Sequence, residues 1–204
     1  MRYHIVHTTT YQFDRPVRLQ PHTVRLRPHC DGTQSLRRFQ IDITPRPHQV
    51  SDVIDAFGNN VLRLWFGEMP VETLAIRTES EVETYRTNPF DYFSEPWAIK
   101  APIDYPHSLA VQLAPYLAPA QLTTLSPAVV ELAQTLLHQE HNNVGLFLST
   151  LTQALYERNR YVQRLEGDPQ PAGVTLARQS GSCRDLTVVF MEACQAIGLA
   201  ARFV

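Results

Sequence analysis

The chain has 204 residues, of which 44% are apolar and 19% are charged, with a formal net charge of −2 at pH 7. This mixture excludes collagen-like, coiled-coil and wholly disordered proteins. No apolar run approaches the roughly 20 residues that a membrane-spanning helix needs, and the first residues do not have the pattern of a signal peptide, so we expect a globular cytoplasmic protein without a membrane partner.

The first half of the sequence has the period-two pattern of strands. Apolar and polar residues alternate over 38–44, 62–66 and 74–82, and turn residues separate these runs. In the first run one face is apolar: Phe39, Ile41 and Ile43. Residues 55–60, Asp-Ala-Phe-Gly-Asn-Asn, can supply the positive φ of a hairpin turn. We predict an antiparallel β-sandwich over residues 1–95.

A proline-rich region follows the predicted strands. Residues 88–119 contain six prolines, and proline interrupts strand ladders and helices alike. We therefore predict a linker over 96–119 and assign 120–204 to a second domain, where the period changes to that of helices.

Two helices are predicted at the start of the second domain. Ser126 and Pro127 supply an N-cap and a first-turn proline for a helix that runs to about Glu140. The apolar stripe of the second helix has helical spacing: Val144, Phe147, Leu148, Leu151 and Leu155.

The last part of the sequence predicts a loop, a buried helix and a strand. Residues 166–181 have no periodic pattern and are expected to form the loop. The helix begins near Cys183, is apolar on most sides and ends at Gly198. The strand is predicted over 199–204, Leu-Ala-Ala-Arg-Phe-Val.

Cys183 has the most distinctive chemical position. Ser182 and Asp185 form an S-x-x-D capping pattern ahead of the apolar run, which places Cys183 in the first turn of the predicted helix. Helix N-termini favour the thiolate and can lower a cysteine pKa from about 8.5 to roughly 3.5–7.5. Gly181 would allow close approach of a substrate, and Arg184 would add positive potential. A buried structural cysteine is the alternative interpretation.

Residues 180–204, SGSCRDLTVVFMEACQAIGLAARFV, resemble the nucleophile segment of the transglutaminase-like superfamily. The shared pattern is a glycine, one residue, the catalytic cysteine and an aspartate two residues later, with a following Ala-Arg-hydrophobic-Val strand. The early segments YHIVHTTTYQFDRPV, LRP and DAFGNNV are similar to the β-rich N-terminal domain of bacterial members. The resemblance implies an α+β fold, in which an antiparallel β-sandwich precedes part of a papain-like core.

The resemblance also implies a cysteine-dependent reaction on amides. In this superfamily a thiolate attacks a carboxamide to form a thioester, a histidine moves protons and an aspartate orients the histidine. Cys183 is then the nucleophile, and the substrate is a peptide or protein amide. Water as the acceptor gives a peptidase or amidase, whereas an amine acceptor gives a transglutaminase. We favour hydrolysis, because water needs no acceptor pocket.

The triad histidine and aspartate are not identified in this sequence. In the superfamily they lie on strands after the one that begins at Leu199, whereas all eight histidines here precede Cys183. Truncation, lost catalysis and substitution by an upstream histidine are the three alternatives. We favour truncation, because a strand over 199–204 would leave an unpaired sheet edge. The 204-residue chain is therefore expected to be inactive, with Asp185 as a helix cap.

Acyl transfer also requires hydrogen-bond donors for the oxyanion. The backbone N–H of Cys183 is one candidate, and the side chain of Gln179 is a second. An exposed loop glutamine without a catalytic role is the alternative for Gln179. Ser182 and Asp185 are predicted to support the site.

No cofactor or metal is expected. Two groups lack the spacing of zinc ligands: His138, Glu140 and His141, and His22, His29 and Cys30. Cys194 lies roughly 16 Å along the predicted helix from Cys183, too far for a disulfide, so it is expected in the core.

Charge is unevenly distributed, with eight Arg and three Asp in residues 1–50. These arginines alternate with apolar residues as on solvated strand faces, so we expect no nucleic-acid partner. The alternative to an enzyme is a non-catalytic scaffold of the same fold that binds a peptide or a glycan.

Overall fold

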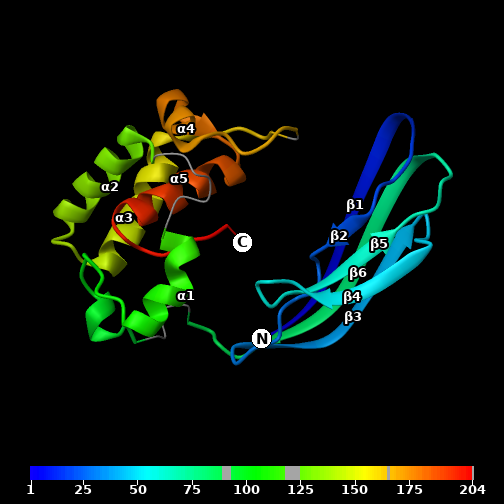
Figure 1. Cartoon of the computed structure of the whole chain (residues 1–204), viewed down its shortest axis with the longest axis horizontal. Coiled ribbons are helices and arrows are strands. Elements are labelled where there is room, and N and C mark those ends of the chain that lie inside the picture. The colour runs from blue at the N-terminus through cyan, green and yellow to red at the C-terminus, as the bar shows by residue number, and fades with distance from the viewer. Residues whose placement is uncertain (89–92, 118–124, 165, 204) are drawn as a thin grey trace. The chain divides into compact units, whose positions relative to one another are not determined.

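The chain folds as two compact units, Met1–Tyr92 and Phe93–Val204. The computed structural model describes residues 1–88, 93–117, 125–164 and 166–203. Figure 1 shows that strands build the first unit and that helices dominate the second. The predicted α+β class is confirmed.

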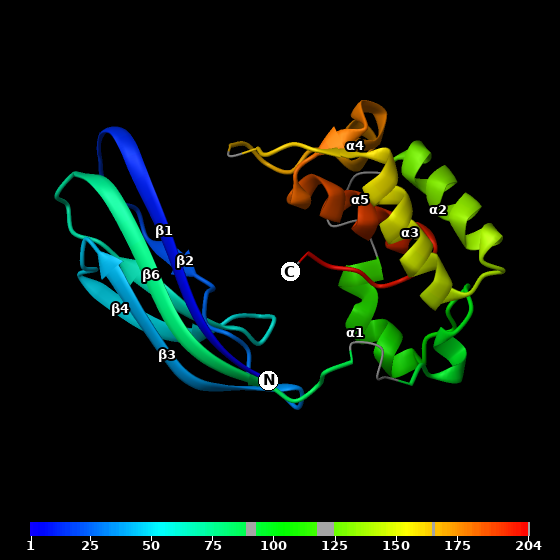
Figure 2. The ribbon, with the colours of Figure 1, turned by 180° about the vertical axis from the view of Figure 1, so that it is seen from behind.

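Two antiparallel three-stranded sheets form the first unit. One sheet has the order β1-β6-β3: Arg2–Val17, Val71–Thr84 and Gln34–Thr44. The other has the order β2-β5-β4: His22–Val24, Asn60–Trp65 and Gln49–Ile54. Figure 2 shows β6 between β1 and β3. Leu64 and Leu74, one from each sheet, are almost completely buried in a shared core, so the predicted β-sandwich is present.

Strand faces and the hairpin turn follow the prediction. Ile41 and Ile43 pack against the core between the sheets. In the turn between β4 and β5, Gly58 has a φ of +80°. The Asp55 carboxylate accepts hydrogen bonds from the Asn59 side chain at 3.1 Å and backbone at 3.0 Å. The side-chain bond from Asn59 is the largest cause that lowers the pKa of Asp55 to about 2.

The described part of the second unit contains five α-helices: α1 His107–Leu117, α2 Pro127–Gln139, α3 Val144–Arg158, α4 Ala172–Arg178 and α5 Cys183–Ala196. It also contains the 3-10 helix η1, Pro96–Ala98, and a parallel pair of short strands, β7 Arg160–Tyr161 and β8 Ser180–Gly181. Val189 and Ala193 of α5 are wholly buried in a core shared with α2, α3 and α4, which confirms that α5 is a buried helix.

Both helices predicted at the start of the second domain are confirmed. Ser126 is the N-cap residue of α2, Pro127 follows it, and Glu140 is the C-cap residue. The predicted stripe of α3 faces the core, since Phe147 and Leu151 have no exposed surface.

Two segments that were predicted to be irregular contain helices. α1 lies within the predicted linker 96–119, of which residues 118 and 119 are outside the described range. Pro115 interrupts its hydrogen bonding, but the carbonyl of Tyr116 accepts hydrogen bonds from Ala201 N and Gln195 Nε2, and these contacts hold the helix end. α4 lies within the predicted loop 166–181. Its local sequence gives only a weak helical pattern, and the burial of Ala172 and Thr175 stabilises the helix instead.

The predicted strand over 199–204 is wrong for its described residues, 199–203, and Val204 lies outside the described range. A strand needs a neighbouring ladder, whereas Leu199 N donates to Cys194 O and Ala201 N donates to Tyr116 O, both at 2.9 Å. Among the described residues, no helix has the length and apolar character to cross a membrane.

Candidate active site

Cys183 is the first residue of α5, and its side chain is exposed. This position agrees with the predicted helix start and argues against a buried structural cysteine. The first N–H groups of a helix have no carbonyl one turn earlier to bind, and they carry the positive end of the helix dipole. An accessible thiol therefore lies at an electropositive helix terminus.

Asp185 holds the start of α5 in place. Its side chain is wholly buried and accepts hydrogen bonds from the backbone N–H and the hydroxyl of Ser182, both at 2.8 Å. Ser182 and Asp185 thus form the predicted capping box. Gln170 N donates to the same carboxylate at 2.8 Å, and Arg164 Nη1 donates at 2.5 Å. The carboxylate therefore joins the segment before α4 to the residue that precedes Cys183.

The charge of Asp185 is stabilised despite its burial. Burial alone would raise the pKa of Asp185, because it disfavours the ionised form. Hydrogen bonds from Gln170 N, Ser182 N, Arg164 and the Ser182 hydroxyl outweigh burial and lower this pKa well below 3.8. The group remains ionised at neutral pH and fits a structural cap.

A short parallel pairing positions the chain before Cys183. Tyr161 of β7 is paired with Gly181 of β8, and Val162 N donates to Gly181 O at 2.9 Å. A Cβ atom at Gly181 would lie 2.9 Å from Asp185 Cβ. Glycine is thus required here for close packing against the capping carboxylate, a reason that differs from the predicted approach of a substrate.

Tyr161 lies beside the nucleophile candidate, although nothing in the sequence indicated this. The negative charge of the Cys183 thiolate, and then a hydrogen bond to the Cys183 side chain, raise the pKa of Tyr161 above its ordinary value. The tyrosine is 59% exposed. A two-residue strand has too few residues to show a period, so only the tertiary structure shows the pair.

Replacing Tyr161 with phenylalanine should slow alkylation of Cys183. The hydroxyl that donates to the thiolate is lost, and solvent exposure limits the effect to about threefold. The rate of iodoacetamide modification at Cys183, measured by peptide mass spectrometry, tests this. Tyr156→Phe, at a tyrosine that is 84% exposed on α3, is the control and should leave the rate unchanged. An equal rate in both variants would contradict the assigned contact.

Gln179 is not joined to Cys183 by any hydrogen bond within the described residues. It is the exposed C-cap residue of α4, with a φ of +49°, and it lines a cavity of about 170 Å³ with Leu132 and Leu176. Its oxyanion role stays a prediction. Arg184 donates to the carbonyls of Arg164 and Glu166 at 3.2 and 3.0 Å, and so supports the neighbouring loop.

Cys194 and the described histidines of the second unit have no hydrogen bond to Cys183. Cys194 is buried, which raises its pKa to about 12 and confirms the predicted core position. The described part of the second unit contains three histidines, and none of them forms a hydrogen bond with Cys183. They are His107, His138 and His141. A search of the described residues finds no group of three or more His, Cys, Asp or Glu that could hold a metal ion.

Residues 3–83 match the family model of the bacterial transglutaminase-like N-terminal region. The matched residues cover most of the first unit. This result confirms the resemblance that the early segments predicted. The search of curated proteins finds no match.

The whole chain also resembles a solved structure, a "putative cysteine protease" from Cytophaga hutchinsonii. The TM-score is 0.64 at 17% sequence identity, over 97% of this chain and 66% of that protein. At this identity the likeness shows the fold alone, and it agrees with the predicted transglutaminase-like architecture. The chain thus spans about two thirds of the length of that protein.

Proposed function

We propose that Cys183 is the nucleophile of a cysteine-dependent amide or peptide hydrolase of the transglutaminase-like type. One observation carries the proposal: an exposed thiol occupies the first position of a buried helix, and its capping aspartate is fixed by Ser182, Gln170 and Arg164. Preorganisation of this kind suits a nucleophile, because the sulfur keeps its position during attack.

In the proposed reaction, the Cys183 thiolate attacks the carbonyl carbon of an amide. The carbonyl oxygen becomes an oxyanion, for which the Cys183 N–H is a suitable donor. Collapse of this intermediate breaks the C–N bond, releases the amine with one added proton and leaves a thioester. Water then attacks the thioester, which yields a carboxylic acid and restores the thiol. An amine in place of water would give transamidation.

The proton donor for the leaving amine is proposed to lie outside the described second unit. Its three histidines form no hydrogen bond with Cys183, and the superfamily resemblance places histidine and aspartate on strands after Leu199. We propose that a longer form of the protein supplies them. The 204-residue chain would then have a reactive thiol without turnover.

The substrate is proposed to be a peptide or protein amide. The similar structure from Cytophaga hutchinsonii carries the description of a protease, which supports this class. Water is favoured over an amine acceptor because it requires no second pocket. The opposite outcome, amine adducts as the main product of a longer active form, would identify a transglutaminase.

Selective alkylation tests the nucleophile. Cys30, which is also free and exposed, is the matched control within the same chain. With iodoacetamide at pH 7, we expect Cys183 to react at least about tenfold faster than Cys30, and the difference should disappear in urea. Peptide mass spectrometry measures both sites in one sample. Equal rates in the folded chain would remove the basis for a nucleophile and favour the scaffold alternative.

Amide turnover tests the missing base. We expect no hydrolysis of a fluorogenic peptide amide by the 204-residue chain above the level of its Cys183→Ala variant. Turnover that depends on Cys183 would show that a histidine within these residues serves as the base.

A further inference from the structure

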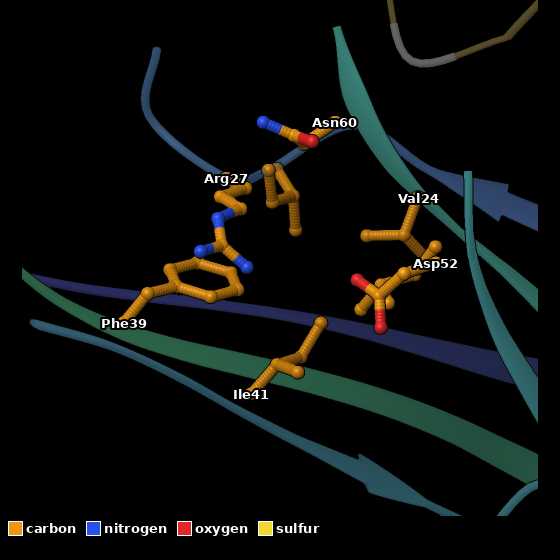
Figure 3. A pocket seen from close by; sticks show the side chains of 8 residues that line it. Val24, Arg27, Phe39, Ile41, Asp52 and Asn60 are labelled. Carbon is orange, nitrogen blue, oxygen red and sulfur yellow. The ribbon is translucent and has the colours of Figure 1, made fainter. Parts of the chain in front are cut away.

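A cavity of about 170 Å³ lies between the two sheets of the first unit. Figure 3 shows side chains from both sheets around it. Phe39 and Ile41 of β3 line it from one sheet, and Val24 and Leu62 line it from the other. Its walls are therefore largely apolar.

Asp52 interrupts this apolar lining. In the sheet register, Leu62 of β5 is paired with Val24 of β2 on one side and with Asp52 of β4 on the other. Residues directly opposite each other in a sheet share a face, so Asp52 lies on the same face as Leu62 and Val24. That face is turned toward the other sheet, where apolar residues are the rule. Asp52 is nevertheless exposed, because β4 is the edge strand of its sheet, so its carboxylate lines the cavity while it remains in contact with solvent.

Arg27 provides the opposite charge at the same cavity. Its guanidinium carbon lies 5.6 Å from the centroid of the Phe39 ring. In Figure 3 the guanidinium lies above Phe39 on one side of the cavity, and the Asp52 carboxylate lies on the other side. Within the described residues, neither Arg27 nor Asp52 has an ion-pair partner. Two opposite charges thus flank an apolar space without neutralising each other.

We propose that this cavity binds a small apolar amino acid in its zwitterionic form. The ligand carboxylate binds Arg27, the ligand ammonium binds Asp52, and the apolar side chain lies against Ile41 and Leu62. The cavity volume is below the roughly 300–1,000 Å³ of pockets for drug-sized molecules, which favours one amino acid over a longer peptide or a nucleotide. The proposal is independent of the chemistry of Cys183.

Three probes of nearly equal shape separate the two charges. They are L-leucine, 4-methylpentanoate, which lacks the ammonium, and 3-methylbutylamine, which lacks the carboxylate. We expect L-leucine to cause saturable amide shifts around Leu62 and Ile41 in NMR spectra of the ¹⁵N-labelled chain. Each singly charged probe should bind about three- to fivefold more weakly, the scale of one exposed ion pair. Absence of saturable shifts, or equal binding of all three probes, would overturn the proposal.

Charge-removing variants assign each contact. Asp52→Asn should remove the preference for L-leucine over 4-methylpentanoate without changing the binding of 4-methylpentanoate. Arg27→Gln should likewise remove the preference over 3-methylbutylamine. Asp42→Asn, which changes a charge on the solvent face of β3, is the control and should retain both preferences. Retention of a preference in its matching variant, or an equal loss for all probes, would contradict the assignment.

Discussion

The Asp185→Ala variant should lose about 3–5 kcal/mol of the free energy of unfolding of the second unit. The wild-type carboxylate is wholly buried and pairs with Arg164, Gln170 N and Ser182 N. Its removal leaves a guanidinium without its counter-charge and two backbone donors without an acceptor, and both losses destabilise the folded state.

Urea denaturation followed by tryptophan fluorescence measures this loss. The chain has two tryptophans, so a Trp65→Phe background leaves Trp97 as the reporter of the second unit. Asp168→Ala is the matched control, because Asp168 is exposed and accepts from Arg164 through its backbone carbonyl. That variant should stay within about 0.5 kcal/mol of its parent. A similar loss in both variants would contradict the importance of the buried carboxylate.

The same pair of proteins should show a defined pH dependence. The folded-state pKa of Asp185 lies below its unfolded value of about 3.9, so the stabilisation is complete above that pH. It is lost as the pH falls through the unfolded value toward the folded one. The difference between wild type and Asp185→Ala should therefore shrink below about pH 4. A constant difference between pH 7 and pH 3 would contradict the charged state assigned to Asp185.

The features that the sequence predicted well depend on neighbours in the chain. The S-x-x-D pattern of Ser182 and Asp185 closes within one turn, and the alternation around Ile41 sets a strand face without information from other segments. Such patterns follow from local backbone geometry, because that geometry fixes the spacing of the residues that share a face or form a cap.

Features that depend on distant contacts were not predicted. Arg164 lies 21 residues from Asp185, and no local pattern links them. Tyr161 reaches Cys183 through a pairing of only two residues on each strand. Pro115 is unfavourable inside a helix. Hydrogen bonds to the Tyr116 carbonyl from residues about 80 positions later outweigh this cost and stabilise the end of α1. The position of Asp52 beside the cavity likewise emerged only from the register of β4 with β5.

Gly181→Ala should destabilise the second unit by about 1–3 kcal/mol, the usual cost of overpacking. The added Cβ would lie 2.9 Å from Asp185 Cβ and 3.1 Å from Thr175 Cγ2. Neither neighbour can move freely, because Thr175 and Asp185 are both wholly buried and the Asp185 carboxylate is held by its donors. The strain must therefore displace the start of α5, and Cys183 should alkylate more slowly as well.

Gly145→Ala separates this effect from a general response to an added methyl group. A Cβ at Gly145 would meet Asn143 Oδ1 at 3.6 Å, an ordinary contact, and alanine favours the helix by up to about 1 kcal/mol. This control should be as stable as wild type or more stable, with an unchanged alkylation rate at Cys183. If Gly181→Ala were also as stable as wild type, with an unchanged alkylation rate at Cys183, the start of α5 would be able to accommodate the added methyl group. Close packing of Gly181 on Asp185 would then not be what positions the thiol.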